Sequence, residues 1–372
     1  MRNAIVSLLA LSPLALGQES TGTVTVYVSL DEDNARPVLA LFEKETGIKV
    51  VARYDTEATK TVGLTRILQE EKGDPQADVF WNNEVAKSIE LREHGVLDRY
   101  DVPNAQSIPA AWKDPAGYWV GFAARARILI VNTDLVPASE MPTSMWDLTK
   151  PKWKGKVCMA KPETGTTATH ATALFTLDEA RAEEYFTKLI ANDCVWLTSN
   201  GQTMRDVAAG RFAFGWTDTD DYWVAKLQGK PVAAVYPDKG ADEAGVLFIP
   251  NSLVLIKGAK HKGAALKLID WLLRPETEAL LAQSSTAQIP VRPEVPAPEH
   301  VLRPEQVGKA MAPDWNRVGR EWQKRVGHLR AKLTGAATQE GEGSKLAWIV
   351  TGVVVVAVFV VVTLRRMTAA PA

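Results

Sequence analysis

Three carboxylates fall within four consecutive positions of one short segment, at Asp218, Asp220 and Asp221. Carboxylate oxygens are hard donors that could hold a hard cation, and the same groups could instead bind an ammonium group or several hydroxyl groups. A further acid, Asp31, lies in a second acidic segment, residues 29–34. Asp31, Asp218 and Asp220 are therefore candidate ligand-binding residues, with helix capping or solubility as the alternative for each segment.

A turn rich in glycine and threonine, residues 163–167 (ETGTT), is the clearest candidate for binding an anion. Gly165 allows the backbone to approach a ligand closely, and Thr166 and Thr167 are expected to begin a helix. Because the first amides of a helix have no acceptor within the helix, they and the two hydroxyls favour an anion. The alternative is that Thr166 or Thr167 is an ordinary N-cap.

Residues typical of covalent or acid–base catalysis form no recognisable pattern in this sequence. The five histidines are dispersed along the chain, and no nucleophile–base pair is evident. Aspartate runs also hold metals in transferases, so a metal-dependent enzyme stays open as an alternative. We expect a binding protein and not an enzyme.

The candidate residues lie in loops of a predicted α/β fold, because strands alternating with helices indicate parallel βαβ units. The pattern predicts strands at 24–29, 48–54 and 77–81, helices at 37–46, 61–71 and 85–94, and a second series that starts with a strand at 155–160. In such sheets, ligands bind beyond the carboxyl ends of the strands. We therefore expect four loops to converge on one site, namely 29–34, 81–84, 162–167 and 217–221.

Both ends of the chain carry patterns typical of membrane targeting. Arg2, an apolar run over 4–16 and small residues at 15 and 17 predict a signal peptide over residues 1–17. Residues 346–364 contain no charge and are followed by two arginines, which predicts a single transmembrane helix. A linker over 335–345 and a cytoplasmic tail over 365–372 would flank it. We therefore expect an extracytoplasmic protein, in the periplasm or on the cell surface, anchored in the cytoplasmic membrane.

Length and charge narrow the class of protein further. The 372 residues suit two lobes and an appendage. The net charge of −1 gives no electrostatic attraction toward nucleic acid, so nucleic acid is not expected as a partner. The two cysteines, Cys158 and Cys194, could form a disulfide in an exported protein or remain two buried thiols.

Four stretches of the chain together resemble a known family. They are residues 24–50 (VTVYVSLDEDNARPVLALFEKETGIKV), 77–84 (ADVFWNNE), 118–132 (YWVGFAARARILIVN) and 146–167 (WDLTKPKWKGKVCMAKPETGTT). In this order they are similar to bacterial extracellular solute-binding proteins of ABC importers, in the branch of ferric-iron-binding periplasmic proteins. The resemblance extends over residues 24–294, and a C-terminal anchor is not typical of it.

The resemblance implies an α/β, two-lobed periplasmic-binding-protein (Venus-flytrap) fold, to which we add the C-terminal single transmembrane helix. We expect lobe 1 over residues 18–120 and 238–334, and lobe 2 over residues 121–237. The implied partners are the permease and ATPase of an ABC importer and a small-molecule or metal ligand. No resident cofactor is required, and ferric iron would be a transported ligand, bound with a synergistic anion.

The resemblance also assigns positions within the site. The turn at 163–167 matches one that holds the anion in ferric-binding relatives, and Asn200 matches an asparagine that also contacts the anion. Among the iron ligands, Asp31 falls at the first position of the family pattern, and Asn83 or Glu84 falls at the second.

The two adjacent tyrosines of the usual ferric site have no match here. The segment 218–221 (DTDD) stands in their place, and Tyr222 follows it, displaced. The candidate metal ligands are then Asp31, Glu84, Asp218, Asp220 and Tyr222. Two ligand hypotheses remain open, namely iron or another metal with an anion, and an organic phosphate, phosphonate or amine. A surface sensor with the same fold is an alternative from another class.

Overall fold

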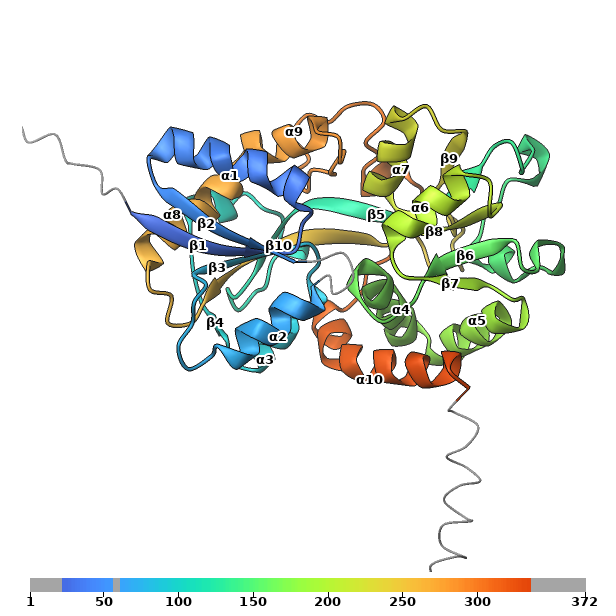
Figure 1. Ribbon diagram of the computed structural model, residues 1–372, viewed down its shortest axis with the longest axis horizontal. Coiled ribbons are helices and arrows are strands. Elements are labelled where there is room, and N and C mark those ends of the chain that lie inside the picture. The colour runs from blue at the N-terminus through green and yellow to red at the C-terminus, as the bar shows by residue number, and fades with distance from the viewer. Residues whose placement is uncertain (1–21, 56–60, 336–372) are drawn as a thin grey trace, which may run out of the picture.

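The computed structural model describes residues 22–55 and 61–335. They form an elongated molecule with two α/β halves side by side, joined by strands that run from one half into the other (Figure 1). The strand order across both halves is β2-β1-β3-β10-β5-β8-β6-β7, with β4 paired to β10 and β9 paired to β5. The predicted two-lobed α/β architecture is confirmed.

The first half is built on three parallel strands, β1 (Thr23–Val28), β2 (Lys49–Tyr54) and β3 (Val79–Asn82). Each strand is followed by a helix: α1 (Glu32–Thr46), α2 (Val62–Glu70) and α3 (Ala86–Glu93). Three valines at alternate positions of β1 are fully buried on one face of the sheet, and Tyr27 is buried on the other, as expected for a strand covered on both faces. The short β4 (Leu97–Asp98), α8 (Lys262–Leu272) and α9 (Pro275–Gln283) complete this half.

Helix α1 begins earlier than the predicted start at residue 37. The backbone carbonyl of Asp31 accepts hydrogen bonds from the amides of Asn34 and Ala35, so Asp31 already occupies the N-cap position. Glu32 and Asp33 stabilise this first turn because their negative charges lie at the positive end of the helix dipole. The acidic segment 29–34 is therefore largely the start of a helix.

Two long strands, β5 (Val120–Asn132) and β10 (Phe248–Ile256), connect the halves. β5 pairs with β10 through residues 120–126 and with β8 through residues 127–131. Ala124 also exchanges two backbone hydrogen bonds of 2.7 Å with Ile289, which makes a third link. Ala123 and Ala287, beside these links, have positive φ angles of 46° and 44°. The backbone is therefore strained where the two halves meet.

The second half contains the strands β6 (Val157–Ala160), β7 (Val195–Leu197), β8 (Phe214–Asp218) and β9 (Val232–Val235). β6 lies between β7 and β8 and is parallel to both. The helices of this half are α4 (Gly165–Leu177), α5 (Glu179–Ala191), α6 (Asn200–Ala208) and α7 (Thr219–Leu227). α4, α6 and α7 directly follow β6, β7 and β8, so their N-termini lie at one edge of the sheet.

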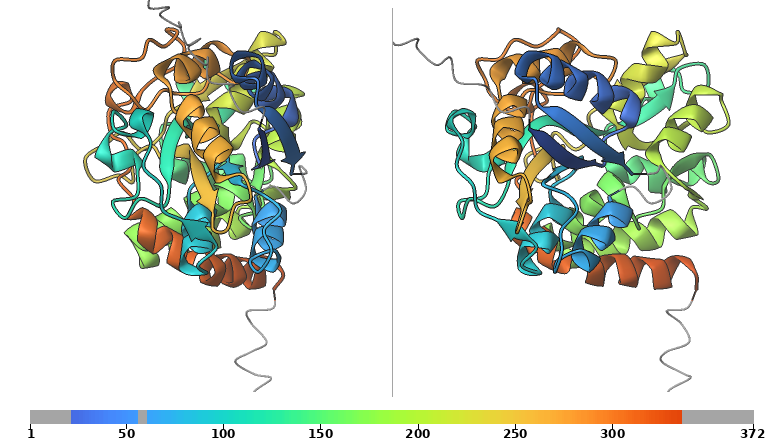
Figure 2. Two further views of the ribbon diagram at one scale, coloured as in Figure 1. Left: turned by 90° about the vertical axis from the view of Figure 1, so that its left-hand side faces the viewer. Right: turned by 60° about the vertical axis from the view of Figure 1, so that its left-hand side comes forward.

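The last described helix, α10 (Trp315–Leu333), contacts both halves. It runs along one long edge of the molecule beside α3 and α4, and the turned views show the same arrangement (Figures 1 and 2). Toward the first half, Gly319 packs against Ile89 of α3. Toward the second half, Arg325 forms an ion pair of 2.7 Å with Glu179. α10 therefore bridges the two halves.

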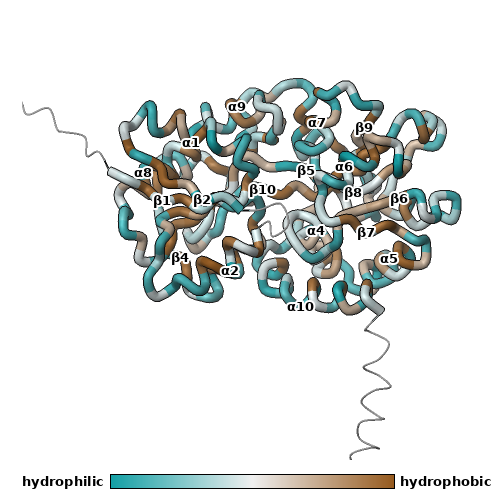
Figure 3. Tube along the Cα trace, in the orientation of Figure 1, coloured by the Kyte–Doolittle hydropathy of each residue, from teal (hydrophilic) through white to brown (hydrophobic). Residues whose placement is uncertain are grey.

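The hydrophobic core follows this division into halves. One large cluster of buried side chains surrounds β1, β3 and α8, and a second surrounds β6, α4 and α5. The apolar residues gather along the central strands, and the outer helices alternate between polar and apolar positions (Figure 3). Each half therefore has a core of its own, and some side chains, such as Ala86 of α3, pack into the core of the other half.

The expected fold class needs one correction. Within residues 22–55 and 61–335, no helix is both long enough and apolar enough to cross a bilayer, so the transmembrane helix is removed from the fold class. The stretch that prompted it, residues 346–364, lies outside the described residues, together with the signal-peptide segment 1–17, most of the linker and the tail 365–372.

The two cysteines are both buried free thiols. β6 and β7 pair so that Cys158 lies opposite Val195, and Cys194 immediately precedes Val195. Because side chains alternate between the faces of a sheet, the two thiols point to opposite faces, and each packs in a different hydrophobic cluster. Of the two possibilities left open by the sequence, the structure has the free thiols.

Candidate ligand-binding cleft

A cleft with a volume of about 640 Å³ lies between the two halves. Its lining comes from the start of α1, the end of β3, the middle of β5 and the N-terminal turns of α4, α6 and α7. The structure therefore brings most of the predicted site residues together here, namely Asp31, Asn83, Gly165, Thr166, Thr167, Asn200, Asp218 and Asp220. Glu84 and Tyr222 are not part of this lining.

Three helix N-termini of the second half, those of α4, α6 and α7, line the cleft. Among the described residues, no protein acceptor is recorded for the amides of Gly165, Thr166 and Thr167 at the start of α4. Gly165 has a φ of +56°, which favours glycine at this turn. Thr164 is the N-cap residue, and it makes no capping hydrogen bond through its side chain. The free amides therefore create a positive potential suited to an anion.

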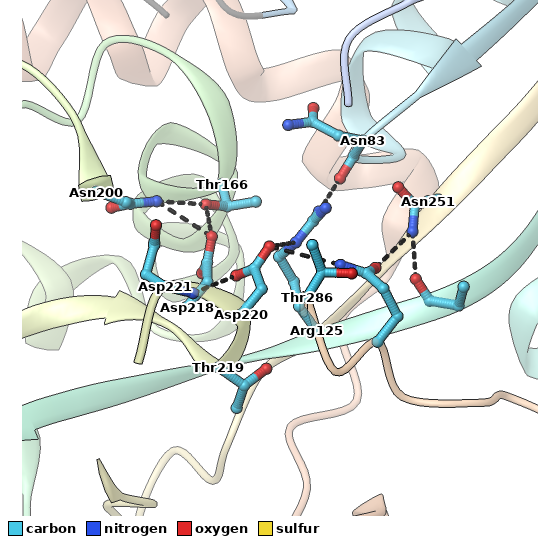
Figure 4. A network of polar contacts seen from close by, with 12 residues as sticks. Asn83, Arg125, Thr166, Asn200, Asp218, Thr219, Asp220, Asp221, Asn251 and Thr286 are labelled. Carbon is cyan, nitrogen blue, oxygen red and sulfur yellow. Dashed lines mark hydrogen bonds and ion pairs between the residues drawn. The ribbon is translucent and has the colours of Figure 1, made fainter. Parts of the chain in front are cut away.

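The hydroxyls of Thr166 and Thr167 take part in a polar network and do not cap the helix; the contacts of Thr166 are drawn in Figure 4. Thr166 donates a hydrogen bond of 2.6 Å to a carboxylate oxygen of Asp218, and Thr167 donates one of 2.8 Å to the side-chain oxygen of Asn200. The amide nitrogen of Asn200 donates in turn to Thr166 (2.8 Å) and to Asp218 (3.1 Å). The alternative of a simple threonine N-cap is therefore wrong.

Behind this network lies Arg127 of β5, whose side chain is fully buried. Its guanidinium forms an ion pair of 2.7 Å with Asp218, whose own side chain is only 6% exposed. The Nε atom of Arg127 is buried without a hydrogen-bond partner among the described residues. Asp218 thus accepts hydrogen bonds from three side chains, Arg127, Thr166 and Asn200, of which Arg127 is also its counter-ion, and they hold its carboxylate in one position.

A second buried arginine, Arg125, forms the floor of the cleft. It donates a hydrogen bond of 3.2 Å to Asp220 of α7 and another to the backbone carbonyl of Asn83 (Figure 4). Burial disfavours its charge, but the carboxylates of Asp220 and Asp218 outweigh burial and raise the pKa of Arg125. Arg125 therefore connects the first half, through Asn83, to the second half, through Asp220.

The three acids at the start of α7 are close enough to share a cation. One carboxylate oxygen from each of Asp218, Asp220 and Asp221 lies within 4.8 Å of the others. Tyr222, the possible phenolate ligand, points away from them and lines a different, small cavity with Trp223 and His300. Burial raises the pKa of the Tyr222 phenol. Among the described residues that line the cleft, none is a tyrosine.

Glu84 is fully buried and takes part in packing the halves together. Its carboxylate accepts hydrogen bonds from the amides of Ala86 (2.6 Å) and Lys87 (2.8 Å) at the start of α3. It also accepts one of 2.9 Å from the hydroxyl of Thr169 on α4. Burial raises the pKa of Glu84 despite these donors. As placed, it lies away from the cleft and is unsuited to be a metal ligand there.

Arg125 and Arg127 are the residues that sequence reasoning missed. They occur two positions apart in an otherwise apolar run, residues 122–131. A charge inside a buried strand needs a partner, so two arginines at this spacing were a usable signal for acids nearby. They change the electrostatics of the site, because Asp218 and Asp220 each have a buried cation beside them.

Comparison with known proteins gives a consistent result. The sequence profile described as "Bacterial extracellular solute-binding protein" matches residues 38–308. Among similar proteins is the "Fe(3+)-binding periplasmic protein" of Serratia marcescens, 24% identical over 77% of this chain and 85% of the relative. Another is the "Spermidine/putrescine-binding periplasmic protein" of Salmonella typhimurium, 27% identical over 87% of this chain and 94% of the relative.

A solved structure resembles the fold in the same way. The periplasmic binding protein AfuA from Actinobacillus pleuropneumoniae, with fructose-6-phosphate bound, has a TM-score of 0.74 and 23% identity. The match covers 84% of this chain and 98% of AfuA. At this level of identity, the likeness supports the fold and leaves the ligand to be argued from the site.

Proposed function

Because this chain belongs to the family of bacterial extracellular solute-binding proteins, we propose that it captures a small solute outside the cytoplasm. It would deliver this solute to the permease and ATPase of an ABC importer, and it would not itself be an enzyme. The predicted signal peptide over residues 1–17 agrees with such a location. The lobes would be residues 18–120 with 238–334 and residues 121–237, and they would close around the ligand.

The observation that carries this proposal is the convergence of three helix N-termini on one polar cleft. Free amides at the start of α4 and the first residues of α6 line the cleft, and Thr166 and Asn200 hold the network beside them in a fixed geometry. Such amides bind phosphate or carboxylate without needing a formal positive charge. The anionic group of the ligand is therefore expected at residues 165–167 and 200–201.

The acids of the cleft suit the other part of the ligand. Asp31 and Asp33 line it from the first half, and Asp220 and Asp221 line it from the second. Carboxylates accept hydrogen bonds from hydroxyl or ammonium groups. We therefore favour an organic phosphate or phosphonate that also carries hydroxyl or amine groups.

Ferric iron with an anion is the second candidate, and one observation favours it. The carboxylate oxygens of Asp218, Asp220 and Asp221 lie within 4.8 Å of one another, a spacing that a hard cation could bridge. Against it, Asp218 is held by the buried Arg127, and Tyr222 is turned away from the cleft. In this hypothesis iron would be cargo, bound mainly by carboxylates.

Native mass spectrometry combined with metal analysis, on protein purified from its own host, tests both candidates. A bound organic mass without stoichiometric metal supports the first candidate, and one iron per chain supports the second. A thermal-shift series with fructose-6-phosphate, an aminoalkyl phosphonate, putrescine and ferric citrate provides an independent ranking. If none of these probes raises the melting temperature and no ligand copurifies, the proposed anion site is contradicted.

A further inference from the structure

The cleft extends beyond the polar network along the side of two helices. On α7 and its C-cap, the lining positions are Asp220, Asp221, Val224, Leu227 and Gln228. Their spacing of three and four residues places them on one face of the helix. On α6, the lining residues Asn200, Gly201, Met204 and Arg205 follow the same rule. One wall of the cleft is therefore made of two helix faces as well as helix ends.

The chemical character of this wall changes along its length. From Asp220 to Leu227 the helix advances seven positions, which corresponds to roughly 10 Å. The first turn of α7 presents carboxylates, and the following turns present Val224 and Leu227, with Met204 of α6 lining the same cavity and the polar side chains of Arg205 and Gln228 beside this apolar strip. Leu227 is 59% exposed. A single exposed leucine is ordinary, but this one continues an apolar strip that begins inside the cleft.

We propose that the ligand of this cleft has an apolar body that lies along α7 over Val224 and Leu227, in addition to its polar head at the starts of α4 and α6. This inference rests on the proposed anion site, because the head fixes the position of the body. A volume of about 640 Å³ is more than an ion and a small anion need, and it matches the size of pockets that take organic molecules. The ligand class is therefore an organic anion with a hydrocarbon segment.

Straight-chain alkyl phosphates of one to six carbons, with inorganic phosphate as the head alone, test this inference by isothermal titration calorimetry. With the wild-type protein, affinity should rise about fourfold for each methylene that reaches the strip. Leu227→Gln and Val224→Thr should remove most of this dependence on chain length and leave the affinity for inorganic phosphate unchanged. Leu135→Gln is the matched control, because Leu135 is 48% exposed and does not line the cleft.

The outcomes separate this inference from the proposed function. If phosphate and all alkyl phosphates bind equally well to the wild-type protein, the apolar body is refuted and the anion site stands. If Leu227→Gln weakens inorganic phosphate as much as hexyl phosphate, Leu227 acts in lobe closure, and the inference is wrong. If no phosphate binds at all, the anion site itself is contradicted.

Discussion

Replacing Asp218 by asparagine should destabilise the ligand-free protein. The substitution keeps the shape of the side chain and an oxygen that accepts from Thr166 and Asn200, but it removes the counter-ion of Arg127. The Arg127 side chain is fully buried, and its remaining contacts with threonine hydroxyls are long, at 3.3 and 3.5 Å. Removing one partner of a buried ion pair typically costs about 3–5 kcal/mol. We expect a loss of this size in the free energy of unfolding.

A double-mutant cycle with Arg127→Met isolates the ion pair. The single Arg127→Met variant leaves Asp218 with two donors, so we expect a smaller loss, about 2–3 kcal/mol. The double variant has neither charge and should lie within about 1–2 kcal/mol of the wild-type protein. Urea unfolding of the ligand-free protein, followed by tryptophan fluorescence, measures all four stabilities.

Asp206→Asn is the matched control for this cycle. Asp206 is also largely buried, but its partner Arg211 is 68% exposed and stays hydrated when the pair is broken. The Asp206→Asn variant should therefore lose at most about 1 kcal/mol of its free energy of unfolding. The reasoning is refuted if Asp218→Asn is as stable as the wild-type protein, or if the double variant loses the sum of the two single losses.

Three further predictions concern other parts of the molecule. Gly319→Ala should destabilise the protein by about 1–3 kcal/mol, because the added Cβ would lie 2.4 Å from a side-chain carbon of Ile89. Gly327→Ala, where the added Cβ meets open space, should stabilise the protein by about 1 kcal/mol. Equal effects of the two substitutions in thermal unfolding would contradict the described packing of α10. Burial raises the pKa of Asp238 from 3.8 to about 6, because the buried site favours the neutral carboxyl group. The raised pKa therefore adds about 3 kcal/mol to the free energy of unfolding below pH 4, and this stabilisation is lost as the pH rises through 6. Urea unfolding between pH 4 and 8 should show this loss in the wild-type protein and not in Asp238→Asn, and parallel profiles would refute it. Small-angle scattering should show a smaller radius of gyration when the copurified ligand is added back to the ligand-free protein, and an unchanged radius would count against lobe closure.

Sequence reasoning located the cleft because the rule that it used depends only on topology. Polar loops after parallel strands meet at one edge of the sheet, and this brought Asp31, Asn83, Gly165 and Asp218 together as predicted. The turn at Gly165 was recognisable because few residues tolerate its backbone conformation. Whether these residues bind a ligand remains a prediction.

The direction of each side chain could not be predicted from the sequence, because neighbouring residues in a turn or helix point in different directions. Asn83 faces the cleft, but the adjacent Glu84 turns back to the start of α3. Asp221 lies on the face of α7 that lines the cleft, and Tyr222, the next residue, is turned away from it and lines a different cavity. The partners of Asp218 were hidden for a related reason, since Arg127 comes from a strand 91 positions earlier in the chain.

The opposite orientation of Cys158 and Cys194 has a consequence for how this protein matures. Each sulfhydryl is enclosed on its own side of the sheet, so the native chain contains no cystine and needs neither an oxidant nor an isomerase to reach it. Burial also raises the pKa of Cys194 to about 12, so almost none of it is the reactive thiolate at neutral pH. Folding should therefore proceed equally well in a reducing and in an oxidising compartment. Because both thiols are buried, the rate at which an alkylating reagent modifies either cysteine would measure how often the second half opens.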